Sequence, residues 1–424
     1  MVGQNVPYRD EGDGVVRTQR GRSGPGVWLD RAWSAPVVVV LALLALVAGC
    51  STGPGGSSAD APPPVPPVAL AASVAPGAVD VAPAEPLVVS AAGGRLSSVT
   101  VTPAGGSGGT ALAGTLDPSG TRWTSATLAF GTQYRVQAVG VDERGAPGAP
   151  LDQTFSTVAP EQTLEVASIR PTDGQTVGVA MPISITFDAP VTDRAAVERR
   201  VSVATSVPTE GSFRWMSDEQ LNWRPKEYWR PGTQVTVNAR LFGVDSGEGL
   251  YGAEDRTFSF TVGRDQRARG DVNAHTLVLY QDGQELRSMP ASYGRDIYPT
   301  QYGVHVAFEK HEVKRMRSDT WGGPAEGTPG FYDQNLPLAV RISNNGEFVH
   351  VNPDTVRQQG RSNVSHGCVN LSPANGQFFF NWVQMGDPVE IVGSSRPLTT
   401  RDGDIADWTI PWEEYRQGSA LASA

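Results

Sequence analysis

The sequence predicts a mainly β protein, with two immunoglobulin-like β-sandwich domains followed by a third β-rich domain that contains one short helix. Two similar segments lie about one hundred residues apart, hairpin patterns of period two follow them, and one well-capped helical segment starts near residue 372. Glycine and proline number 48 and 33, which is typical of many short strands joined by turns.

The internal repeat supports the two sandwich domains, which we place at residues 87–159 and 160–264. A Gly-Thr-Gln triplet precedes an alternating run at residues 131–133 and again at residues 232–234. Neither unit contains cysteine, so both lack the disulfide bond of antibody domains. No catalytic pattern occurs in them, and we interpret both as spacers, scaffolds or interaction modules.

The third domain is placed at residues 271–393. Residues 275–290 alternate around Asp282-Gly283, a pair that favours a tight hairpin turn. A second hairpin at residues 337–350 turns at Asn-Asn-Gly, so His350 ends a strand. A further strand is expected at residues 388–392, after the helix.

The helix has clear start and stop signals. Ser372 is a good N-cap, Pro373 a good first helical residue, and Gly386 a good stop after Met385. Cys368 lies four residues before the cap, in a turn that contains glycine. We expect the positive end of the helix to favour the thiolate form of Cys368 modestly.

The first 49 residues predict export. A charged flank and an apolar run of about 15 residues end in small residues before Cys50, which indicates a secretory signal and is short of the ~20 residues of a membrane span. The junction resembles the bacterial lipobox, in which the cysteine is acylated. We therefore expect a lipid on Cys50 that holds the protein at the outer face of the cytoplasmic membrane, in the cell-wall zone. An uncleaved anchor helix is the alternative.

Two further segments flank the domains. Residues 50–86 are rich in Pro, Gly and Ala and predict an extended tether. The tail at residues 394–424 carries Trp408, Trp412 and Tyr415, which we expect to pack against the body of the protein.

The formal net charge of −10 argues against nucleic acid or anionic lipid as the main partner. The basic run at residues 310–317 is a local exception. We interpret it as a solvated strand face or loop, with contact to an acidic substrate as the alternative.

Cys368 is one of only two cysteines and has no partner in the chain if Cys50 carries lipid. An unpaired thiol in an exported protein is either a catalytic group or a buried, inert one. A nearby imidazole such as His350 could take its proton and generate the nucleophile. Zinc binding by His350, His366 and Cys368 is disfavoured, because two of them are only two residues apart and the motif holds no acid. No metal, nucleotide or other cofactor is expected.

His350, sixteen residues before His366, and Ser-His-Gly-Cys-Val-Asn at residues 365–370 resemble the signature of the L,D-transpeptidase (YkuD-type) catalytic domain. The resemblance covers the third domain, about 120 residues, through residues 371–392 and back through residues 292–294, 299–300 and 303. The wider layout resembles actinobacterial, mycobacterial-type lipoproteins of this family. It implies a peptidoglycan enzyme that takes an acyl group from a tetrapeptide stem through a cysteine thioester. The acceptor is the side-chain amine of a neighbouring stem's diamino acid, which gives 3-3 cross-links, and carbapenems acylate the cysteine.

The resemblance also implies roles for individual residues. Cys368 is the nucleophile, and His350 is the base, oriented by the backbone carbonyl of Val351. Amides around Gly367 and Cys368 supply the oxyanion donors, and His366 shapes the site by hydrogen bonds.

Five substrate-binding positions follow from the same resemblance: Ser365, Asn370, Tyr332, Met316 and Trp321. Tyr332 would line the donor pocket, whereas Met316 and Trp321 would lie on a flap over the site. Many relatives carry tyrosine at the position of Trp321, which puts any hydroxyl contact there in doubt.

Two other functions remain open on the sequence. An L,D-carboxypeptidase or thiol hydrolase would share the acyl-enzyme and resolve it with water. A cell-wall-binding lipoprotein with an inactive catalytic domain would keep the layout without the reaction, although the intact Cys368 and His350 argue against it.

Overall fold

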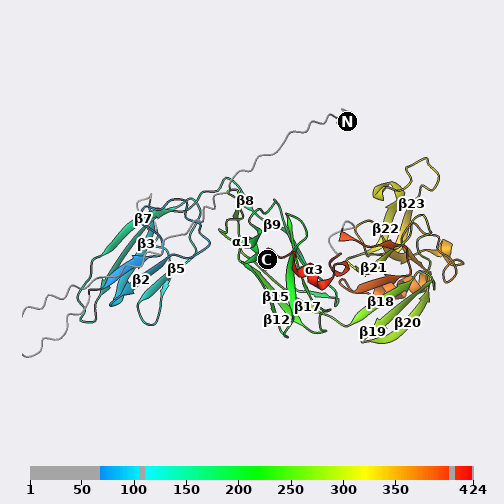
Figure 1. Cartoon of the computed structure of the whole chain (residues 1–424), viewed down its shortest axis with the longest axis horizontal. Helices are drawn as coiled ribbons and strands as arrows, with labels where there is room; N and C mark the ends of the chain where they lie inside the picture. Colours follow the sequence, from blue (N-terminus) through cyan, green and yellow to red (C-terminus); the bar gives the residue numbers. More distant parts are fainter. Residues whose placement is uncertain (1–66, 105–109, 401–405, 423–424) are drawn as a thin grey trace, which may run out of the picture. The chain divides into compact units, whose positions relative to one another are not determined.

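The computed structural model describes residues 67–104, 110–400 and 406–422 (Figure 1). The predicted signal, Cys50 and most of the predicted tether lie outside these residues. Within the described ranges, no helix has the length and apolar character needed to cross a membrane.

The first sandwich domain consists of two antiparallel sheets. One has the order β1-β2-β5-β4, and the other β3-β6-β7. Their strands are β1 (Ala69–Ala72), β2 (Val88–Ala92), β3 (Arg95–Pro103), β4 (Gly114–Leu116), β5 (Arg122–Ser125), β6 (Gln133–Val141) and β7 (Leu151–Ser156). Strand β1 pairs with β2, so the predicted tether at residues 50–86 extends too far. Its four-residue sequence, ALAA, lacks the β-branched and aromatic residues that indicate a strand.

The second sandwich domain has sheets of order β10-β17-β15-β12 and β13-β14-β11-β9, with a small pair β16-β8. Its elements are β8 (Thr163–Leu164), β9 (Val166–Arg170), β10 (Gln175–Val177), β11 (Ile183–Phe187), α1 (Arg194–Glu198), β12 (Val201–Thr205), β13 (Gly211–Trp215), β14 (Gln220–Pro225), β15 (Gln234–Ala239), β16 (Tyr251–Gly252) and β17 (Arg256–Val262). The two domains together confirm the predicted immunoglobulin-like class.

One packing device recurs in both sandwiches. A core tryptophan, Trp123 or Trp223, lies over a glycine of the neighbouring strand, Gly114 or Gly211. A Cβ atom at either glycine would lie 2.0 Å from the tryptophan Cζ2. Only glycine fits under each ring, so each core tryptophan requires a glycine on the neighbouring strand.

The third domain contains two sheets packed around one core. The six-stranded sheet has the order β20-β19-β18-β26-β21-β27, and the four-stranded sheet β22-β23-β24-β25. Its strands are β18 (Gln266–Asp271), β19 (Thr276–Gln281), β20 (Gln284–Pro290), β21 (Gln301–Val306), β22 (Glu309–Arg317), β23 (Asp333–Arg341), β24 (Phe348–Val351), β25 (Val369–Leu371), β26 (Pro388–Val392) and β27 (Arg396–Pro397). Strand β18 starts before residue 271, so this domain begins earlier than predicted.

Both predicted hairpins of this domain are confirmed. Asp282 and Gly283 have φ of 51° and 78°, and the two positive values are the ones that a tight turn of type I′ requires. Strands β23 and β24 form the second hairpin, which places His350 in β24, one residue before the strand ends.

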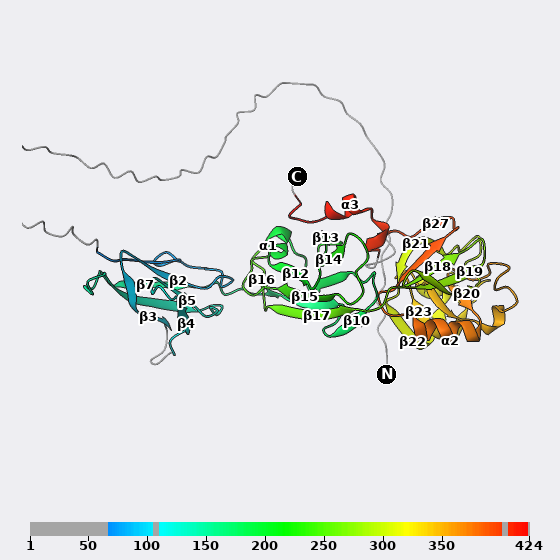
Figure 2. The ribbon, with the colours of Figure 1, turned by 90° about the horizontal axis from the view of Figure 1, so that it is seen from below.

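Helix α2 (Pro373–Trp382) begins as predicted, because the Ser372 hydroxyl accepts a hydrogen bond from the Asn375 N–H at 3.3 Å. It ends at Trp382 rather than Met385, since Val383 is already extended. The helix lies against the four-stranded sheet (Figure 2). There Gly376 contacts Val351, and a Cβ atom at Gly376 would lie 2.2 Å from Val351 Cγ2.

The tail packs against the body, as the sequence predicts. It forms the 3-10 turn η4 (Asp407–Thr409) and the short helix α3 (Trp412–Arg416). Tyr415 is fully buried, and Trp408 Nε1 donates to the Ala180 carbonyl at 2.7 Å.

Candidate active site

The parallel pairing of β24 and β25 brings the two reactive residues of the sequence analysis together. Val349 lies opposite Val369 and His350 opposite Asn370, and Cys368 immediately precedes β25. Cys368 and His350 both line a cavity of about 180 Å³, hereafter the His350 cavity. Its other lining residues are Met316, Tyr332, Gln334, Leu336, Asn352, Thr355, Val364, Ser365, His366 and Asn370.

The orientation of His350 is fixed by the strand that carries it. Its side chain is 2% exposed, and Nδ1 lies 3.0 Å from the carbonyl oxygen of Val351, the expected acceptor. A carbonyl accepts only, so Nδ1 carries the proton and Nε2 has a free lone pair. His350 is therefore set up to take a proton through Nε2.

Burial keeps both reactive groups neutral at rest. It raises the pKa of the Cys368 thiol to about 12, and the charge of nearby Glu347 acts in the same direction. It lowers the pKa of His350 to about 4. The expected help from the helix is not found, because β25 separates Cys368 from α2 and the helix dipole acts mainly within its first turn. The thiol donates instead to the Gly346 carbonyl, with an Sγ–O distance of 3.7 Å.

The turn before Cys368 is held from within by Ser365. Its hydroxyl donates to the Cys368 carbonyl at 2.6 Å and accepts from the Gly367 N–H at 3.1 Å. Gly367 has a φ of 125°, which glycine alone adopts readily. Since the Gly367 N–H already has this acceptor, the Cys368 N–H is the better oxyanion donor: across the described residues it makes no hydrogen bond.

His366 has a different task from His350. The Arg295 guanidinium, which can only donate, hydrogen-bonds to His366 Nε2, so this nitrogen is an acceptor and the ring is neutral. Burial, and then Arg295, lower the pKa of His366. The ring also packs against Tyr332 and Tyr298, with centroids 4.9 and 5.1 Å apart. His366 orients the walls of the site rather than serving as its base.

Both predicted flap residues lie next to Cys368: Met316 packs with it, and Trp321 lines a small gap with it. Trp321 is in the 3-10 turn η1 (Ser318–Trp321), and its Nε1 donates to the Tyr332 hydroxyl at 2.9 Å. The indole thus supplies a hydrogen-bond donor at the position where many relatives carry a tyrosine. Met316, 7% exposed, packs in a small apolar cluster with Cys368.

Asn370 faces the His350 cavity with an available acceptor. Its Nδ2 donates to Thr355 Oγ1 at 3.3 Å, whereas its buried Oδ1 has no partner among the described residues. A substrate N–H could use this oxygen.

Sequence reasoning missed several residues around the thiol. Arg295 and Tyr298 hold the His366 ring, Thr300 Oγ1 donates to the Gly367 carbonyl at 2.7 Å, and Glu347 lies buried behind the turn. Residues 292–303 matched the family pattern, but no local signal shows that they reach a turn some seventy residues away.

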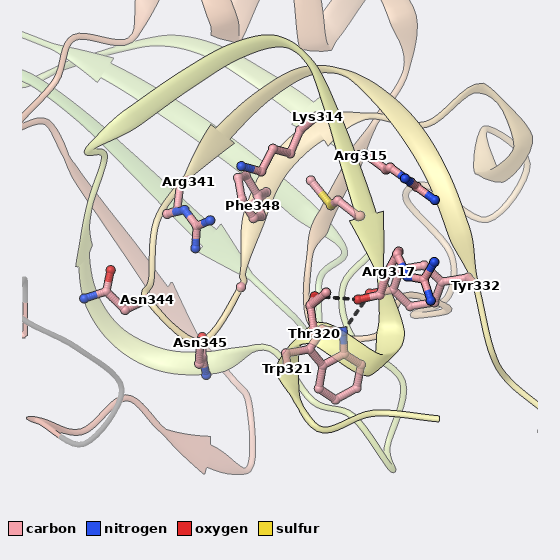
Figure 3. Close-up of a pocket in the computed structure, with 12 residues that line it drawn as sticks. Lys314, Arg315, Arg317, Thr320, Trp321, Tyr332, Arg341, Asn344, Asn345 and Phe348 are labelled. Atoms are coloured by element: carbon pink, nitrogen blue, oxygen red, sulfur yellow. Dashed lines mark hydrogen bonds between the residues drawn. The ribbon is translucent and has the colours of Figure 1, made fainter. Parts of the chain in front are cut away.

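A second cavity shares Met316 and Tyr332 with the His350 cavity. It measures about 420 Å³ and is called the Lys314 cavity hereafter (Figure 3). Its lining residues are Lys314, Arg315, Met316, Arg317, Thr320, Trp321, Tyr332, Arg341, Asn344, Asn345, Gly346 and Phe348. Cys368 itself lines a gap of about 40 Å³ that shares Trp321, Tyr332, Asn345 and Gly346 with this cavity. No group of three or more His, Cys, Asp or Glu side chains in the described ranges could hold a metal ion.

Comparison with known proteins agrees with this geometry. The family model of the L,D-transpeptidase catalytic domain matches residues 265–391, and that of the bacterial Ig domain matches residues 78–245. L,D-transpeptidase 2 of Mycobacterium tuberculosis is 36% identical over 421 residues, which are 96% of this chain and 99% of that protein. The chain belongs to the L,D-transpeptidases.

Further relatives of this L,D-transpeptidase are similar over shorter stretches. L,D-transpeptidase 5 of M. tuberculosis is 39% identical over 85% of this chain and 78% of that protein. Among solved structures, the L,D-transpeptidase LdtMt1 in complex with imipenem is 39% identical, with a TM-score of 0.48 over 55% of this chain and all of that one. An L,D-transpeptidase from Mycobacterium smegmatis is 36% identical, with a TM-score of 0.46 over the same shares.

Proposed function

We propose that this L,D-transpeptidase forms 3-3 cross-links between peptidoglycan stems through a thioester on Cys368. The observation that carries the proposal is the His350 cavity, which holds the thiol and an imidazole whose Nε2 is free to accept a proton. The membership of the family supports the reaction type.

In the first half-reaction Cys368 Sγ attacks the carbonyl between the diamino acid and the terminal D-alanine. Because the resting thiol is protonated, the S–H turns from the Gly346 carbonyl and its proton passes to His350 Nε2 as the C–S bond forms. The Cys368 N–H stabilises the oxyanion, a contribution worth about 10²–10³ in rate for one donor in other enzymes. His350 then protonates the leaving amine, D-alanine departs, and the thioester remains.

In the second half-reaction the side-chain amine of a neighbouring stem attacks the thioester. His350 takes a proton from this amine and returns it to the departing sulfur, which regenerates the thiol. Water in place of the amine would give the carboxypeptidase reaction. The two neighbouring cavities, which share Met316 and Tyr332, favour transpeptidation, because that reaction has to hold two stems at once.

The decisive experiment is an assay with disaccharide-tetrapeptide. The purified protein should convert it to 3-3 cross-linked dimers that mass spectrometry detects, and the Cys368→Ala variant should not. Tripeptide without dimer would replace the proposal by the L,D-carboxypeptidase.

We also propose that carbapenems acylate Cys368, since a relative 39% identical to this chain has been solved in complex with imipenem. The wild type should gain one drug-sized mass increment, which Cys368→Ala lacks. A wild type without adduct would favour the inactive cell-wall-binding alternative.

Finally, we propose that a lipid on Cys50 anchors the protein to the outer face of the cytoplasmic membrane. The support is the small-residue junction before Cys50, at the end of an apolar run. Replacing Cys50 with Ala should release the protein from the membrane fraction; continued tight association would favour an anchor helix.

A further inference from the structure

The basic run of the sequence forms strand β22 of the flap, and its cations do not all face the same way. Met316 is buried beside Cys368, and Lys314, two residues earlier, lies on the same face because side chains alternate along a strand. Lys314 is only half-buried and points into the Lys314 cavity next to Phe348 (Figure 3). The structure thus turns one lysine of the run towards the active site.

Lys314 differs from the arginines around it. Arg315 pairs with Asp333 at 2.6 Å, Arg317 with Asp319 at 2.6 Å, and Arg341 with Glu309 at 3.0 Å.

Lys314, by contrast, takes part in no ion pair within the described ranges. The lining of the cavity contains four cationic side chains and no carboxylate. An anionic group that enters the cavity would meet a lysine that no protein acid already neutralises.

The cavity is also close enough to the thiol to receive part of the substrate. Its lining residue Gly346 supplies the carbonyl that accepts the Cys368 S–H. Trp321 and Tyr332, joined by their hydrogen bond, line both this cavity and the gap that Cys368 reaches.

The proton transfers made by His350 indicate which part of the substrate enters the Lys314 cavity. His350 serves both the leaving amine of the donor and the attacking amine of the acceptor, so both amines must lie on the His350 side of the sulfur. His350 lines the smaller cavity and not the larger one. The acyl part of the donor stem then extends away from His350, towards the Lys314 cavity, which His350 does not line.

We propose that Lys314, supported by Arg341, binds a free carboxylate of the donor stem; this rests on the peptidoglycan function proposed above. Such a carboxylate is present on the diamino acid side chain and on the acidic residue before it, and amidation of either removes its charge. The enzyme would therefore prefer donors in which the carboxylate that Lys314 binds is not amidated.

The test uses three donor tetrapeptides: unamidated, amidated on the diamino acid, and amidated on the preceding residue. Their affinities for Cys368→Ala are measured by calorimetry, so that binding is separated from reaction. One amidated form should bind about tenfold more weakly than the unamidated donor, the effect of one partly exposed charge-assisted hydrogen bond. Which form it is identifies the carboxylate.

Adding Lys314→Gln to Cys368→Ala should abolish this difference. Adding Arg357→Gln, which removes an exposed cation that lines neither cavity, should leave it intact. The free energy of urea unfolding of the single variant Lys314→Gln, compared with that of the wild type, checks that the variant still folds.

Equal affinity of Cys368→Ala for all three donors would overturn the proposal, as would a full difference that persists with Lys314→Gln. These outcomes are distinct from failure of the proposed function, in which the wild type forms no dimers although the affinities still differ.

Discussion

At the scale of single residues, Cys368 and His350 are both uncharged before substrate binds. A thiol with pKa near 12 beside an imidazole with pKa near 4 is a thiol–imidazole pair at every pH between these values. A substrate carbonyl in contact with Cys368 N–H would drive the proton transfer, so that a charged nucleophile is not exposed while the site is empty.

This protonation state predicts the pH dependence of acylation. The rate of carbapenem acylation should be constant from about pH 5 upwards and fall below that with a midpoint near 4, because protonated His350 cannot accept the thiol proton. Stopped-flow measurement of adduct formation checks this, with circular dichroism to exclude acid unfolding.

An acylation rate that changes with pH between about 5 and 8 would contradict this prediction. Alkylation of Cys368 gives a second check. A preformed thiolate–imidazolium pair would keep Cys368 reactive towards iodoacetamide at neutral pH, whereas the neutral thiol should react slowly there and faster as the pH rises.

The sequence could predict that Cys368 and His350 come together, because the spacing and residue types of the motif indicate it, and both line one cavity. Their protonation could not, because it depends on burial: Cys368, for example, packs with Met316 and Phe348, which lie 52 and 20 residues before it in the chain. The sequence placed a helix N-terminus near Cys368, but the intervening strand β25 moves that charge away.

At the scale of elements, the contact between α2 and β24 fixes the orientation of His350. Gly376 allows the helix to approach Val351, and the Val351 carbonyl in turn orients His350. The sequence predicted the start of α2 from its cap and both hairpins from their turns, since these signals are local. It did not predict the end of the helix or strand β1, which tertiary contacts decide.

Gly376→Ala should therefore damage both stability and the site. Its Cβ would meet Val351 Cγ2 at 2.2 Å, and overpacking of this kind costs about 1–3 kcal/mol. We expect a lower midpoint of urea unfolding and slower carbapenem acylation, as the Val351 carbonyl shifts.

The matched control is Gln377→Ala, on the exposed face of the same helix, which should change stability by less than about 0.5 kcal/mol. If Gly376→Ala leaves the free energy of unfolding unchanged, then β24 moves enough to accommodate the added methyl group, and it does so without displacing His350.

At the scale of the whole molecule, the tail joins the catalytic domain to the second sandwich domain through a buried carboxylate. Asp407 accepts hydrogen bonds from the Tyr415 hydroxyl at 2.7 Å and from Asn222 Nδ2 at 3.0 Å. Arg224 lies over the Trp408 and Tyr415 rings, 4.5 and 4.4 Å from their centroids. The aromatic residues of the tail thus surround a buried polar contact that contains Asp407 and Arg224. No feature of the sequence predicts that Asp407 is buried there.

This contact predicts a pH dependence of stability. Burial raises the pKa of Asp407 from 3.8 to about 6, so the folded state takes up a proton more readily than the unfolded state. The ionised carboxyl therefore destabilises the fold above pH 6, and this cost disappears as the pH falls from 6 to about 4. The stability of the wild type relative to Asp407→Asn should rise by about 2 kcal/mol across that window.

Urea unfolding of the two proteins from pH 4 to 7 measures the difference. Other buried acids, such as Asp387, titrate in both proteins and cancel. A difference that does not change with pH would mean that Asn222, Tyr415 and Arg224 stabilise the Asp407 charge fully, and that the tail contact is equally strong in acid and at neutral pH.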